Sequence, residues 1–284
     1  PPHLFSSAAS DVYKRQASFS LLRSEVISIA DGIDQIYVGG YVGRGNIAIP
    51  GLPYGILEGE VIRRDYGSLD GTDHTQVHWD DRTNYTPIVN ANGGYQFLGY
   101  GVIGNPQPDF VYGVTNTLSY KWATLRVQFD SQVGGDVFST TNSTLLGRGI
   151  LQETDFDRFV PVVTNGLSAD GTPNTTQTTA NAHYWPNTGV FYDENSIYDA
   201  SVMRLREVSL SFVAPKSFLN GTPFGNASLT LSAQNIWHYA WNTPSGTNFD
   251  PEVISYGAGS NARGFDEMTG PTAKKYGATL SLTF

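Results

Sequence analysis

Cysteine is absent from this chain of 284 residues, and only 15% of its residues are charged, against about 25% in an average soluble domain. The lack of cysteine excludes disulfide bridges, cysteine-ligated metals and thiol catalysis. Acidic residues outnumber basic ones by 26 to 17, for a formal charge of -9. This balance argues against a nucleic-acid partner, because phosphate binding needs clustered lysine and arginine. No stretch approaches the ~20 consecutive apolar residues of a spanning helix. The chain does contain 31 glycines and 13% aromatic residues, which is typical of many strands joined by turns.

The last nine residues alternate strictly between two kinds of side chain. Small or polar residues take every second position, and the apolar face comprises Tyr276, Ala278, Leu280, Leu282 and Phe284. Such alternation predicts a strand with two unlike faces, which suits a soluble β-sandwich or an outer-membrane β-barrel. Aromatic residues bracket the run, and a strand of this length tilted by about 40° rises ~20 Å, near the ~25 Å apolar band of such barrels. Both details favour the membrane.

The same alternation recurs in Ala123–Val133, where a polar face opposes an apolar one. Arg126, Gln128 and Asp130 lie on the polar face, and Glu207 precedes another alternating run. In a barrel the polar face meets a water-filled lumen. We therefore expect these four residues to line a lumen.

Other segments are expected to add strands to the same antiparallel meander. Residues 112–120 should pair with Ala123–Val133 through a short turn near Lys121, as a hairpin. Further strands are expected at 208–212, 229–233 and 55–64, with two weaker ones within 18–41. The fold class is therefore all-β.

The connections between these strands alternate in length. Short turns are expected near Lys121 and at 215–225, whereas long polar excursions run over 65–108, 134–200 and 238–272. Structureless loops of this size count against a compact soluble domain. Outer-membrane barrels have short periplasmic turns and long extracellular loops, so the pattern predicts three extracellular excursions.

Six motifs follow one another in a family-specific order. They are GLPYGILEG at 51–59, IGNPQPDF at 103–110, FDSQVGGDVF at 129–138, MRLREVSLSF at 203–212, SAQNIW at 232–237 and DPEV at 250–253. In order and spacing they resemble SusC/RagA-type TonB-dependent outer-membrane transporters, over most of the chain from about residue 50 onward. Residues 268–274 depart from the family pattern, which loosens the register of the last loop.

This resemblance implies a transmembrane barrel of about 22 strands, with an N-terminal plug domain that couples to the TonB complex. It implies import of glycan oligosaccharides or peptides through a multi-pass barrel in the cell outer membrane, with a SusD-like surface lipoprotein as lid. Residues 17–284 would be the C-terminal portion of that barrel, without enzymatic activity. The final strand also resembles the signal that outer-membrane assembly machinery reads, and its signal residues would be Tyr276, Leu280, Leu282 and Phe284.

A secreted carbohydrate-binding or hydrolytic β-sandwich is the alternative from another class. A sandwich buries the apolar faces of its strands against a second sheet. A barrel wall instead presents a continuous apolar band on its outside. The two hypotheses therefore differ in whether the apolar face is covered.

Residues 1–16 differ in character from the rest. They lack the apolar core of a signal peptide, and SDVYKRQ at 10–16 resembles translated sequencing adapter at the broken ends of metagenomic reading frames. We expect 1–16 to be an artefactual leader, and the natural protein to continue upstream.

Metal and cofactor sites are not expected. His74 and His78 lie four residues apart beside Asp73, Asp80 and Asp81, but on a strand this spacing is ~13 Å, too far for one ion. We therefore interpret these residues as part of a solvated loop. Calcium held by outer-loop carboxylates such as Asp70, Asp73 and Asp81 is kept as the alternative.

Catalytic groupings and phosphate loops are not expected either. No nucleophile–histidine–acid set can be assembled, and the glycines at 39–45 are better explained as turn residues than as a phosphate loop. The tryptophans at 79, 185, 237 and 241 would suit sugar stacking or a membrane-interface belt. Trp237 is assigned to the belt, and Trp185, in a long loop, is a candidate contact for substrate or the lid partner.

Overall fold

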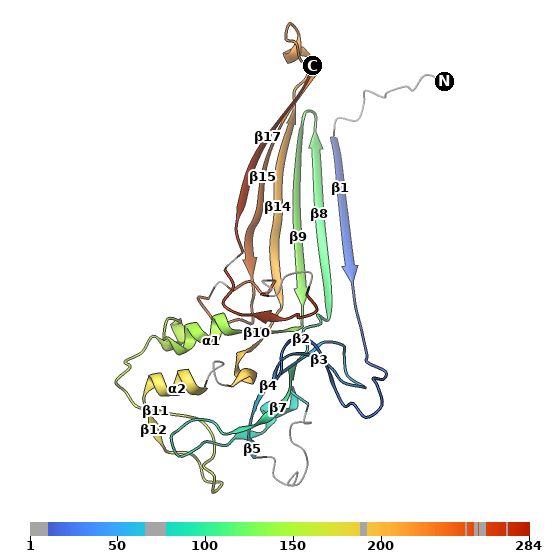
Figure 1. Ribbon diagram of the computed structural model, residues 1–284. Coiled ribbons are helices and arrows are strands. Elements are labelled where there is room, and N and C mark those ends of the chain that lie inside the picture. The colour runs from blue at the N-terminus through green and yellow to red at the C-terminus, as the bar shows by residue number, and fades with distance from the viewer. Residues whose placement is uncertain are drawn as a thin grey trace.

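The structure, a computed structural model, describes residues 11–65, 78–187, 192–247, 249–252, 255, 260–270 and 272–284. Six long strands form one antiparallel sheet, which we call the wall (Figure 1). In spatial order its strands are β1 (Asp11–Ser20), β8 (Phe110–Tyr120), β9 (Ala123–Val133), β14 (Val202–Val213), β15 (Asn226–Tyr239) and β17 (Lys275–Thr283). The expected all-β meander is confirmed. Strand β9 has 11 residues, so at ~3.4 Å per residue it crosses the ~25 Å apolar band even when tilted by about 40°.

Two short connections lie at one end of the wall and three long ones at the other (Figure 1). Lys121, with a φ of 50°, and Trp122 join β8 to β9. Residues 214–225, which include α3 (Lys216–Leu219), join β14 to β15. The first, second and third excursions are residues 21–109, 134–201 and 240–274. The predicted alternation of lengths is therefore confirmed.

The three excursions fold together into what we call the loop layer, and they are not structureless. The first contains the four-stranded sheet β2 (Ile36–Tyr41), β3 (Arg44–Ala48), β4 (Ile56–Ile62) and β7 (Phe97–Gly104), and the pair β5 (Arg64–Asp65) and β6 (Thr86–Pro87). The second contains β10 (Asp136–Ser139), α1 (Thr140–Gly147), β11 (Val162–Val163), β12 (Gln177–Thr178), α2 (Ala180–Asn187) and β13 (Ile197–Asp199). The third contains β16 (Phe265–Asp266), which pairs with β10.

The buried apolar core lies in the loop layer and joins all three excursions. Leu57 and Val61 of β4 pack with Phe138 of β10 and Phe265 of β16. The rings of Phe138 and Phe265 have centroids 5.5 Å apart. The loop end of the wall is therefore held together by a compact layer with its own apolar core.

Two strand predictions were wrong about location. Residues 55–64 were expected in the wall, but β4 lies in the loop layer, where six of its seven residues are buried. A strand covered on both faces loses the alternation that marks a wall strand, which is why its run of apolar residues misled the assignment. Of the two strands expected within 18–41, one is the end of β1 and the other is β2, so the first excursion begins at Leu21 and not at Asp65.

The structure extends β1 into the suspected leader. Residues 11–16 pair with residues 115–120 of β8, and this register puts Arg15 on the apolar face, where it bonds to Asn116. The artefactual origin of residues 1–16 stays a prediction. Within the part of the chain that the structure describes, no helix is long and apolar enough to span a bilayer.

Candidate functional site

The apolar face of the wall is continuous across all six strands. In the strand register Leu118 lies opposite Leu125, Leu125 opposite Leu210, and Leu210 opposite Leu231. Three of these leucines are exposed, at 50% for Leu118, 37% for Leu125 and 44% for Leu231, and Leu210 is half-buried. Among the described residues no second sheet packs on this face. An uncovered apolar surface of this extent indicates contact with a lipid or a protein. A β-sandwich would cover this face with a second sheet, so the observation disfavours the sandwich.

The opposite face is polar, and the register brings the predicted lumen residues together on it. Gln128 lies opposite Glu207, and Asp130 opposite Arg204. Arg126 donates a hydrogen bond of 3.3 Å to Gln128 on the same strand. Arg126, Gln128, Asp130 and Glu207 therefore share one face, and their contact with a lumen stays a prediction.

A β-bulge in β14 explains how Glu207 reaches this face. The pairing of β14 with β9 shifts between Leu205 and Glu207, so Arg206 is an extra residue. An extra residue turns the following side chains to the other face. The sequence carries the signal: the apolar positions are odd-numbered at Met203 and Leu205 and even-numbered from Val208 onward.

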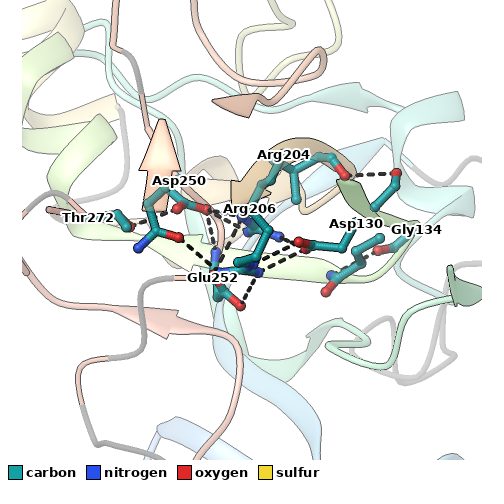
Figure 2. Close-up of polar contacts among 11 residues, drawn as sticks. Asp130, Gly134, Arg204, Arg206, Asp250, Glu252 and Thr272 are labelled. Atoms are coloured by element: carbon teal, nitrogen blue, oxygen red, sulfur yellow. Dashed lines mark hydrogen bonds and ion pairs between the residues drawn. The ribbon is translucent and has the colours of Figure 1, made fainter. Parts of the chain in front are cut away.

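Arg204 and Arg206 hold the third excursion against the polar face, through a cluster we call the latch (Figure 2). Arg204 donates two hydrogen bonds to one carboxylate oxygen of Asp250, at 3.2 and 2.6 Å. Arg206 donates two to Asp130, at 2.7 and 2.8 Å, and two to Glu252, at 2.8 Å each. Thr272 donates its hydroxyl to the other oxygen of Asp250 at 2.7 Å. From the sequence these arginines suit loop pairing or lipid contact, and the structure shows loop pairing.

The inner half of the latch is buried and charged. The side chains of Arg204 and Asp250 are only 6% and 2% exposed. Burial raises the pKa of Asp250, but the hydrogen bonds and charge of Arg204, with the hydroxyl of Thr272, outweigh it and hold the pKa below its ordinary value. Asp250 is therefore ionised at neutral pH, and its buried negative charge is stabilised mainly by Arg204.

A second set of ion pairs, whose carboxylates are buried and which sequence reasoning missed, joins the first excursion to the second. Arg44 bonds to Asp193 at 2.5 Å, and Arg64 pairs with Glu194. The same two carboxylates accept backbone N–H groups of Glu60 and Ile62 in β4. They therefore fix the edge of β4 to the second excursion.

Trp185 lies in α2, where it packs against α1. An added side chain at Gly147 would meet its ring at 3.0 Å, and the guanidinium of Arg148 lies 4.3 Å from the ring centroid. One face of the indole is thus occupied by a cation. A contact of Trp185 with substrate or a lid partner stays a prediction.

No metal centre is evident among the described residues, where no three His, Asp or Glu side chains converge. His78 lies 3.7 Å from Asp80 and stacks on Trp79. Asp70, Asp73 and His74 of the calcium and metal hypotheses lie outside the described residues.

Asp136, at the start of β10, has an unusual environment in the loop layer. Its carboxylate accepts the backbone N–H of Asn105 at 2.6 Å. The pKa of Asp136 is raised to about 6, mainly because the carboxyl group is buried. The hydrogen bond from the Asn105 N–H lowers the pKa, whereas the negative charges of Asp80, Asp199 and Asp109 raise it.

A pH dependence of stability follows from this shift. The pKa in the folded protein exceeds the ordinary 3.8, so the folded chain binds this proton more tightly than the unfolded chain. The stabilisation is complete below the ordinary pKa and is lost as the pH rises through about 6. We expect Asp136→Asn to raise the unfolding temperature of the full-length protein more at about pH 7 than at about pH 5. Asp31→Asn is the control, because Asp31 is exposed in the first excursion and is not one of the carboxylates that act on Asp136. Equal pH profiles for wild type and Asp136→Asn would contradict this assignment.

The fold and its two unlike faces are those of part of a β-barrel wall with its loop layer. No protein-family model matches the chain. Over 213 residues it is 27% identical to TonB-dependent receptor P3 of Formosa agariphila, which covers 69% of this chain and 18% of that receptor. TonB-dependent receptor P26 of the same organism is 27% identical over 192 residues, 64% of this chain and 18% of that receptor.

Solved structures show the same fold. The RagAB peptide transporter matches with a TM-score of 0.56 and 16% identity, over 97% of this chain and 27% of that chain. The closed-closed state of the RagAB peptide importer matches with a TM-score of 0.58 and 18% identity, over 97% of this chain and 28% of that chain. The chain thus spans about a fifth of the curated relatives' length. These comparisons confirm the resemblance to SusC/RagA-type TonB-dependent transporters, and the relatives are named as receptors and transporters rather than enzymes.

Proposed function

We propose that this chain forms the C-terminal part of the barrel wall of a TonB-dependent transporter that imports nutrients across the outer membrane. One observation carries the proposal: the wall has an uncovered apolar face, a polar face behind it, and all three excursions at one end. This is the arrangement of a lipid-facing band around a watery lumen, with short periplasmic turns and long outer loops. The remaining strands of a barrel of about 22 strands, and its plug, would belong to the rest of the protein.

The proposed cargo is a peptide or a glycan oligosaccharide. Peptides are supported by the similarity to RagAB, which is a peptide transporter and importer. We further propose a SusD-like lipoprotein as lid over the loop layer and energy input from TonB through the plug. The polar row Arg126, Gln128, Asp130 and Glu207 would line the transport path.

The last wall strand is proposed as the signal for outer-membrane assembly. Tyr276, Leu280 and Leu282 of β17 lie on its apolar face, in register with Ala233, Leu229 and Ala227 of β15. Phe284 continues that face and packs against Phe224, with ring centroids 5.1 Å apart. Backbone groups on an unpaired edge are costly in lipid, so correct delivery of this strand would decide whether the barrel closes.

Cysteine labelling tests the orientation of the wall. The natural lack of cysteine gives a clean background, and Thr175, Ser245, Ser217 and Asn220 are all exposed. On intact cells that carry the full-length transporter, cysteines at Thr175 or Ser245 should react with an impermeant thiol reagent. Cysteines at Ser217 or Asn220, in the β14–β15 connection, should react only after the outer membrane is opened.

The opened-cell sample is the control for accessibility at all four positions. Labelling of the β14–β15 connection on intact cells, with protection of the loop layer, would reverse the proposed orientation. Equal labelling of all four positions would contradict a membrane-spanning wall and would favour the secreted sandwich.

A further inference from the structure

We propose that the short-turn end of the wall binds the phosphodiester headgroup of a glycerophospholipid with net negative charge from the adjoining leaflet. The site is a cavity of about 620 Å³ between the two short connections, lined by Lys121, Trp122, Val213, Pro215, Lys216 and Leu219 among others. The proposal rests on the membrane orientation proposed above, which the labelling experiment tests separately.

The cavity lies at the short-turn end of the wall, where Lys121 and Trp122 bring it to the edge of the apolar face. The ring of Trp122 packs on that of Phe212, with centroids 5.6 Å apart, and Phe212 lies on the apolar face in register with Ala123. The ammonium of Lys121 lies 5.1 Å from the ring centroid of Tyr120, on the same face. Aromatic and lysine side chains at the end of an apolar band occupy the depth of lipid headgroups.

Charge identifies the occupant. Lys121 and Lys216 line the cavity, and no carboxylate lines it. Within the described ranges, neither ammonium forms an ion pair with the protein. Two unpaired cations beside one cavity favour an anionic ligand, and lysine binds phosphate as a point charge.

The rest of the lining distinguishes a lipid from a free anion. Trp122 is 50% exposed, and Leu219 and Pro215 add further apolar surface. A soluble phosphate would leave this surface in water. A phospholipid places its phosphodiester between the lysines and its glycerol and first acyl carbons against the apolar side chains.

The test measures lipid retention by the purified full-length transporter in detergent, by native mass spectrometry with phosphatidylglycerol as probe. Each basic residue near an anionic lipid contributes a factor of about five in affinity, so Lys121→Gln with Lys216→Gln should weaken binding roughly 25-fold. Lys274→Gln with Lys275→Gln is the matched control, since it removes two lysines at the loop end of β17, and it should bind as wild type does.

Three results would overturn the proposal. The first is equal phosphatidylglycerol retention by both double variants, because the short-turn lysines would then contribute nothing. The second is equal retention of phosphatidylcholine and phosphatidylglycerol by wild type, because net charge would then not decide binding. The third is full displacement of phosphatidylglycerol by inorganic phosphate, which would indicate a site for free anions. Wild-type mobility of each variant on an unheated gel confirms that it is folded.

Discussion

Replacement of Arg204 by alanine is expected to destabilise the loop end of the full-length transporter by about 3–5 kcal/mol, the usual cost of removing one partner of a buried ion pair. Asp250 would remain buried at 2% side-chain exposure without its cation. The third excursion should then detach from the wall. The measurements are the temperature at which the heat-sensitive gel mobility is lost and the rate of proteolytic cleavage within 240–274.

Two further variants distinguish the effect of breaking the ion pair from the effect of removing a side chain. Arg126→Ala is the matched control, because Arg126 lies on the same polar face but is exposed, and such exposed changes cost within about 0.5 kcal/mol. Arg204→Met combined with Asp250→Asn should recover much of the loss, since it leaves no unpaired buried charge. If Arg204→Ala and Arg126→Ala unfold at the same temperature, the latch does not hold the excursion.

Arginine at Val127 should reduce the outer-membrane level of the full-length protein sharply, whereas arginine at the adjacent Gln128 should leave it nearly unchanged. Val127 lies on the apolar face opposite Val208, and Gln128 lies on the polar face opposite Glu207. A charged side chain at mid-bilayer costs ~2–4 kcal/mol. The amount of folded protein in outer-membrane fractions measures the effect.

The pair Val127→Arg and Gln128→Arg is internally matched, because the same side chain is introduced at neighbouring positions of one strand. Equal losses would mean that both faces are buried in protein. Equal tolerance would mean that neither face meets hydrocarbon.

The local patterns in the sequence were sufficient to predict most strands of the wall. Strand β9 has the predicted bounds, β8, β14 and β15 contain the runs that predicted them, and β17 contains all of its run except Phe284. Alternation with a period of two is a local property of the sequence, so it can be recognised wherever a strand has one apolar and one polar face. Strand β4 has both faces buried, and the same reasoning placed it in the wrong sheet.

The sequence by itself determined the all-β class, the two faces of the wall, the alternation of short and long connections and the family resemblance. The tertiary structure alone decided that the long excursions form a packed layer, and which charges meet within it. Arg204 and Asp250 are 46 residues apart, and Arg44 and Asp193 are 149 residues apart. No local period relates such residues, because their approach depends on where three separate excursions return to the same end of the wall. The sequence shows charged residues in loops, and the fold turns them into buried ion pairs.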